Sequence, residues 1–152
     1  MDPLEHASIP LLAYLALSAD PHWGCILALV LGAVFPDLDA FTKEHRSYLH
    51  SLLIALPLSF PALHSEYYAF FFLGWMSHLF LDFFTGVIPF TYPLSRTGYG
   101  AEFHAKGGPG GLKIEGHFIK RYPDPRRAYE ISIGGSLALS ILTLVVLILR
   151  MS

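Results

Sequence analysis

Charged residues are scarce in this chain. Only 14% of the 152 residues are Asp, Glu, Lys or Arg, whereas about a quarter of the residues of an ordinary soluble domain are charged. Hydrophobic residues make up 53%, and the mean hydropathy is +0.48. The formal net charge of -2 gives no overall attraction to nucleic acid. The composition therefore predicts a membrane protein whose partners are lipids, with no nucleic acid among them.

Cysteine is nearly absent. The single residue of this type, Cys25, excludes an internal disulfide and any cysteine-rich zinc site. A metal ion would have to be held by histidine and carboxylate, and the chain has eight histidines. The N-terminal stretch "MDPLEHASIPLLAYLALSADP" lacks the positive leader and small-residue cleavage site of a secretory signal, so we expect it to belong to the mature protein.

Apolar runs broken by Pro, Gly and polar residues predict an all-α fold with about five transmembrane helices in a single domain, residues 1–152. Helices are expected near residues 5–19, 23–35 and 67–84, with a third run at 51–63 interrupted by Pro57 and Pro61. The uncharged run at 131–149 is long enough to cross a bilayer core of roughly 30 Å. The Gly- and Pro-rich residues 96–130 are expected to form a loop.

The basic residues are concentrated in that loop. By the positive-inside tendency, a cytoplasmic loop carries the excess of Lys and Arg. Counting four antiparallel helices back from it places the N-terminus and the end of the 67–84 helix on the cytoplasmic side, with the C-terminus outside. The prediction is a multi-pass protein of the inner or plasma membrane. It rests on seven of the ten basic residues: Arg96, Lys106, Lys113, Lys120, Arg121, Arg126 and Arg127.

The same topology brings the unexpected polar residues of residues 1–95 to the cytoplasmic interface. Each has an ordinary alternative: His78 and Asp82, spaced i and i+4, can bond each other or a neighbouring carbonyl, and acidic residues after a helix can cap the next one. Surface roles remain open for the remaining histidines. The coincidence favours a site, because four separate segments deliver histidine and aspartate to one end: His6, Asp37, Asp39, His45, His50, His78 and Asp82.

Such a set has the chemistry of a divalent metal site. Imidazole and carboxylate suit Zn most directly, with Mn or Fe as alternatives, and the i, i+4 pair supplies two ligands from one rigid helix. Asp37 and Asp39, spaced i and i+2, can share one or two ions, as hydrolytic sites with two metals require. Either aspartate can serve as a general base, and Arg46 can offset developing negative charge.

Two stretches carry a family resemblance, "GAVFPDLDAFTKEHRSYLHSLL" and "GWMSHLFLDFFTGVIPFTYPLS". Together they resemble the YdjM-like family of membrane-bound metal-dependent hydrolases, itself distantly similar to zinc-dependent phospholipase C and P1 nuclease. The resemblance implies that the seven histidines and aspartates form the metal site. Family members usually have Thr where this chain has Leu49, which puts the orientation of His50 in question. Glu115, after a Gly-rich stretch, matches a family glutamate or is an ordinary loop residue.

Two functions remain open at this point. The resemblance implies a hydrolase that uses a metal-activated water on a phosphoester of an amphiphilic, lipid-like substrate. The alternative is a membrane protein without enzymatic activity that handles metal ions or protons. No internal repeat of the kind common in transporters is evident, which favours the hydrolase.

Overall fold

A computed structural model describes residues 2–41, 46–108, 111–123 and 135–152. These residues form five α-helices: α1 (Pro3–Leu17), α2 (Trp23–Val34), α3 (Leu52–Leu58), α4 (Glu66–Thr85) and α5 (Gly135–Met151). Short 3-10 helices η1 (Phe35–Phe41), η2 (Tyr48–His50) and η3 (Phe60–Leu63) lie between them, and the strands β1 (Gly98–Gly108) and β2 (Gly111–Arg121) form an antiparallel sheet.

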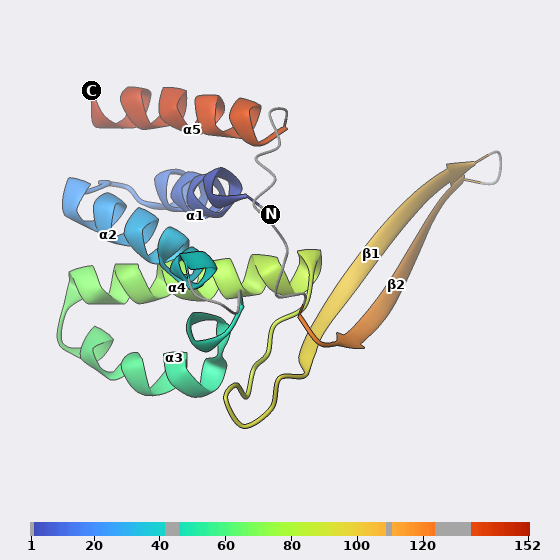
Figure 1. Ribbon diagram of the computed structural model, residues 1–152. Helices are drawn as coiled ribbons and strands as arrows, with labels where there is room; N and C mark the ends of the chain where they lie inside the picture. The colour runs from blue at the N-terminus through green and yellow to red at the C-terminus, as the bar shows by residue number, and fades with distance from the viewer. Residues whose placement is uncertain (1, 42–45, 109–110, 124–134) are drawn as a thin grey trace.

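The helices are stacked in the order α5, α1, α2, α4 and α3 (Figure 1). Asp2 begins α1 by accepting a hydrogen bond from the Glu5 amide at 3.0 Å, the usual role of an N-cap aspartate. Ser65 caps α4 in the same way through the Tyr68 amide. The interruption expected at Pro57 and Pro61 is present, because α3 ends at Leu58 and η3 follows.

The packing of α2 against α4 is close enough for backbone to meet backbone. A Cβ atom on Gly32 would lie 1.8 Å from the Phe71 carbonyl oxygen, and one on Gly74 would lie 2.1 Å from the Leu29 carbonyl oxygen. Only glycine permits this approach at both positions. Trp75 and Leu79 of α4 are buried in the hydrophobic core beside this helix contact.

The expectation of an all-α fold is wrong for residues 98–108 and 111–121. They form the β1–β2 hairpin, in which Ala101 pairs with Phe118 and Phe103 with Gly116, and Figure 1 shows the two strands extending away from the helices. Its base is held against α4, since a Cβ atom on Gly100 would lie 1.8 Å from the Gly86 carbonyl oxygen. The Gly-rich composition that suggested a loop here permits this close contact of two backbones.

Four of the five helices in the described ranges have fewer than the roughly 20 residues of a typical membrane span. α1 has 15 residues, α2 has 12, α3 has 7 and α5 has 17, whereas α4 has 20. Within the described ranges, no helix combines the length and the apolar character that a membrane crossing requires. The prediction of about five transmembrane helices is therefore not confirmed, although a helix does lie in each of the predicted runs. Residues 131–134 of the last predicted span lie outside the described residues.

Candidate metal centre

Histidine and aspartate side chains from four segments meet in one buried cluster. His6 comes from α1, Asp37 from η1, His50 from η2, and His78 and Asp82 from α4. Atoms of His6, His78 and Asp82 that could coordinate a metal ion all lie within 4.8 Å of one another, and so do those of Asp37, His50 and His78. His78 belongs to both groups, so the two candidate positions share one imidazole.

The imidazoles of His50 and His78 face each other with their Nε2 atoms 3.2 Å apart. The Nδ1 atom of His78 donates to the Ala33 carbonyl oxygen at 2.7 Å, and that of His50 donates to Asp39 Oδ2 at 3.1 Å. A carbonyl only accepts, so the Nδ1 proton leaves the Nε2 atom of a neutral His78 with a lone pair. The same holds for His50. Two lone pairs directed at each other repel unless a metal ion or a proton lies between them.

The separation fits a shared metal ion. Two imidazole nitrogens on one tetrahedral zinc ion, each about 2.0–2.1 Å from it, lie roughly 3.3 Å apart. A proton is the competing occupant. Burial lowers the pKa of His50, but hydrogen bonds to Asp39 and Asp82 outweigh that effect and raise it. Protons and metal ions are therefore expected to compete for this position.

Asp82 lies at the centre of the cluster. Its Oδ1 atom is 3.3 Å from His6 Nε2 and 2.9 Å from Arg46 Nη2, while Oδ2 is 3.5 Å from His50 Nε2. The distance from Oδ2 to His78 Nε2 is 3.7 Å, too long for a hydrogen bond. The two residues of α4 therefore do not satisfy each other, although His78 does bond a neighbouring carbonyl, that of Ala33, as the ordinary alternative for this pair allowed.

His6 and Asp37 complete the two groups. The His6 ring stacks on His78 with centroids 3.7 Å apart, and its buried Nδ1 atom has no hydrogen-bond partner among the described residues. Asp37 Oδ1 lies 3.8 Å from His78 Nε2, and its side chain is 14% exposed, compared with 3% for Asp82. Burial raises the pKa of Asp37 despite the nearby His6 and His50. Asp37 is thus the more basic and more accessible carboxylate.

Asp39 lies behind His50 and orients it. Its Oδ2 atom accepts hydrogen bonds from the backbone amides of Ser47 at 2.9 Å and Leu49 at 3.0 Å, in addition to the His50 ring. Trp75 donates to the Leu49 carbonyl oxygen at 2.7 Å. These hydrogen bonds fix the backbone of residues 47–50. His50 therefore has an orienting partner in Asp39, although Leu49 stands where family members usually have Thr.

Arg46 links the cluster to the segment after α4. Its backbone φ of 58° is uncommon for a residue with a side chain, and its guanidinium contacts both Asp82 and the Val87 carbonyl oxygen. Gly86 leaves room for it, because a Cβ there would lie 2.2 Å from Arg46 Nη1. The guanidinium therefore balances the charge of Asp82 in an apolar environment.

The remaining predicted residues lie elsewhere. His45 falls outside the described residues. Glu115 is in β2, opposite His104 in the register, and belongs to neither group of coordinating residues found in the described part of the chain. Sequence reasoning allowed a neighbouring carbonyl as a partner of His78 but did not identify that of Ala33, because a backbone oxygen carries no signal in the residue pattern.

Comparison with known proteins identifies a family. No curated protein and no solved structure matches the chain. The model of the YdjM inner membrane protein family matches residues 1–152, the whole length. The chain therefore belongs to the YdjM inner membrane protein family.

Proposed function

We propose that this protein is a metal-dependent hydrolase that cleaves a phosphoester of an amphiphilic, lipid-like substrate at the inner membrane. The observation that carries the proposal is the pair of Nε2 atoms of His50 and His78, 3.2 Å apart, each with its Nδ1 atom committed to an acceptor. This arrangement is costly when empty and favourable around a cation. Metal binding would account for the presence of five ionisable side chains in one cluster of a largely apolar protein.

The ligands of the proposed site would be the imidazoles of His6, His50 and His78 with the carboxylates of Asp37 and Asp82. Mixed nitrogen and oxygen donors suit Zn best, with Mn or Fe also acceptable, and two overlapping groups offer room for one or two ions. A bound ion of this kind supplies Lewis-acid activation of water and attraction for an anionic oxygen.

Other side chains would prepare the site for hydrolysis. Asp37, with its raised pKa and its partial exposure, is suited to accept a proton from water. Arg46 is close enough to Asp82 to offset negative charge that develops on a phosphoryl group. Asp39 holds the His50 tautomer, as partners of metal-binding histidines generally do, and so acts as a positioning residue.

A second function has some support from the same contacts. His6, Asp82, His50 and His78 form a continuous series of close polar contacts, which also suits transfer of protons or storage of a metal without hydrolysis. The two functions differ in one measurable respect. A hydrolase turns over a phosphoester in a metal-dependent manner, whereas a protein that only handles ions does not.

We further propose that the protein is embedded in the inner membrane as a multi-pass protein, with the cluster at the cytoplasmic interface. Large apolar side chains point outward from four helices, as membrane-facing surfaces do. The concentration of basic residues in residues 96–130 supports a cytoplasmic location for the end of the helices that carries the cluster. A lipid-like substrate would enter there from the bilayer. The exposed residues include Leu27, Leu31, Leu56, Leu73, Phe80, Leu144, Ile148 and Leu149.

Labelling of cysteine variants tests this orientation. In a Cys25→Ser background, an impermeant maleimide should react with Lys120→Cys only from the cytoplasmic side and with Ser152→Cys only from the opposite side. Lys120 belongs to the basic segment, and Ser152 ends the chain. Labelling of both positions from the same side would contradict the proposed number of crossings.

Removal of the two α4 residues tests the function. The double variant His78→Leu, Asp82→Leu should lose the bound metal and with it any hydrolysis of a phosphodiester or phosphomonoester lipid. The helices should still associate, because the change leaves α4 more apolar and helix packing in lipid does not require this pair. Metal content by mass spectrometry and phosphate release by the purified protein are the measurements.

A matched control is His64→Leu, which removes an exposed histidine from the segment between η3 and α4. It should keep the wild-type metal content and activity. If the double-leucine variant retains wild-type metal content, the ligands have been misassigned. If the wild-type protein binds metal but hydrolyses no phosphoester, the hydrolase proposal fails and ion handling remains.

Asp39→Asn tests the orienting role separately. We expect metal affinity to fall by about 10- to 100-fold, the usual effect of losing such a partner, while saturating metal restores the bound ion. Titration with Zn measures this, and Asp20→Asn, an exposed aspartate after α1, is the control. Unchanged affinity in Asp39→Asn would show that the Asp39 carboxylate charge does not support His50.

A further inference from the structure

The β1–β2 hairpin has two chemically different faces. Successive side chains of a strand point to opposite sides, and paired residues share a side. Tyr99, Ala101 and Phe103 therefore lie on the same face as Phe118 and Ile114 of β2, according to the register. The other face carries polar residues, including Glu102, which is paired with His117, and Glu115.

The apolar face is open to the surroundings over much of its length. Phe103 is 63% exposed, Ile114 is 66% exposed and Phe118 is 89% exposed. A hairpin of two strands is marginally stable in water unless its apolar face packs on something. Tyr99 at its base is less exposed, and the Lys120 ammonium lies over its ring, 5.8 Å from the centroid.

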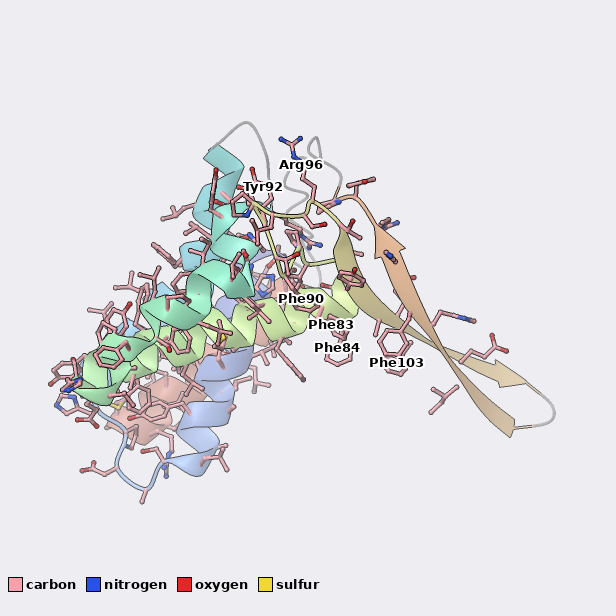
Figure 2. All side chains as sticks on the ribbon, turned by 90° about the horizontal axis from the view of Figure 1, so that it is seen from below. Phe83, Phe84, Phe90, Tyr92, Arg96 and Phe103 are labelled. Carbon is pink, nitrogen blue, oxygen red and sulfur yellow. The ribbon has the colours of Figure 1, made fainter. Side chains whose placement is uncertain are left out.

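This face continues into an aromatic row on α4. The Phe103 ring lies 5.8 Å from that of Phe84, which in turn lies 4.9 Å from that of Phe80. Figure 2 shows Phe83 and Phe84 at the end of α4 with Phe103 beyond them on the hairpin. Phe80 is 63% exposed, so one apolar surface runs from α4 onto the hairpin. The apolar surface of the helices thus continues onto the hairpin.

The charge of the hairpin identifies the kind of surface that it fits. Residues 98–121 contain four basic and two acidic side chains, an excess of two positive charges in a chain whose net charge is -2. Aromatic residues combined with lysine and arginine are characteristic of segments that lie in the interface of an anionic bilayer. The remainder of the chain has a net negative charge and is not attracted to an anionic bilayer in this way.

We propose that the hairpin is a membrane anchor. Its apolar face, defined by Phe103, Ile114 and Phe118, lies in the headgroup region of an anionic phospholipid bilayer, with its polar face toward water. The base of the hairpin adjoins the metal centre, since Gly100 packs on Gly86 and Arg46 binds Val87. The anchor therefore holds the site end of the helices at the level of the phospholipid headgroups. This inference rests on the membrane location and is independent of metal binding.

Adjacent positions on β2 provide the test. Phe118→Cys and His117→Cys, each in a Cys25→Ser background, are spin-labelled in the full chain and reconstituted in bilayers containing phosphatidylglycerol. Collision rates are measured with oxygen, which partitions into lipid, and with a water-soluble nickel chelate. The ratio of oxygen to nickel collisions should be several-fold higher at position 118 than at position 117, and this difference should shrink in bilayers of phosphatidylcholine alone.

Equal ratios at positions 117 and 118 in the anionic bilayer would overturn the proposal. A label at position 118 that is shielded from both reagents and shows dipolar coupling to another label would also overturn it, because a second copy of the chain would then cover the face. Circular dichroism verifies that the variants are folded. The same measurement in the His50→Leu background, which leaves the ion pair of Arg46 with Asp82 in place, should be unchanged, so failure of the anchor is distinguishable from failure of the metal site.

Discussion

The contact of α2 with α4 at Gly32 and Gly74 determines the position of the candidate metal centre. Because the two backbones touch there, the next turn of α4 brings His78 against the end of α2, where the Ala33 carbonyl oxygen accepts its Nδ1 proton at 2.7 Å. That hydrogen bond sets the tautomer and aims Nε2 at His50. A larger residue at either glycine would separate the helices and move His78 away from this acceptor.

The same geometry explains why so many polar groups are tolerated inside an apolar bundle. Burial of an ionised carboxylate costs several kcal/mol unless compensating charges and hydrogen bonds surround it. Asp82 has Arg46 and two imidazoles within 3.5 Å, and Asp39 has two backbone amides and one imidazole. The compensation is less complete between His50 and His78, whose facing nitrogens both act as acceptors when the two imidazoles are neutral. A cation at that point would relieve the remaining repulsion.

Much of this cluster could be predicted from the sequence, because the antiparallel order of the expected helices gives the end at which each polar segment lies. Four antiparallel segments with His or Asp at one end must bring those residues together, and the structure places His6, Asp37, His50, His78 and Asp82 in one cluster. The sequence did not reveal that Asp39 serves His50 from behind, since ligands and their orienting partners have the same residue types. Only coordinates distinguish the two roles.

The hairpin was missed for a different reason. Its glycines, among them Gly98, Gly100 and Gly116, suggested a loop and obscured the alternation of Tyr99, Ala101 and Phe103. The length of the apolar runs was also misleading, because α1 ends at Leu17 and α3 at Leu58, before the ends expected at residues 19 and 63. The composition predicted a membrane protein, but the length of each helix depended on how the helix packs in the fold.

X-ray absorption at the zinc edge, on purified protein loaded with zinc, tests the central claim most directly. The account predicts a first shell of nitrogen and oxygen at about 2.0–2.1 Å, with outer-shell scattering from at least two imidazole rings. Loss of that imidazole scattering is expected in the His50→Leu variant. A protein that takes up no zinc, or zinc bound without imidazole, would contradict the account.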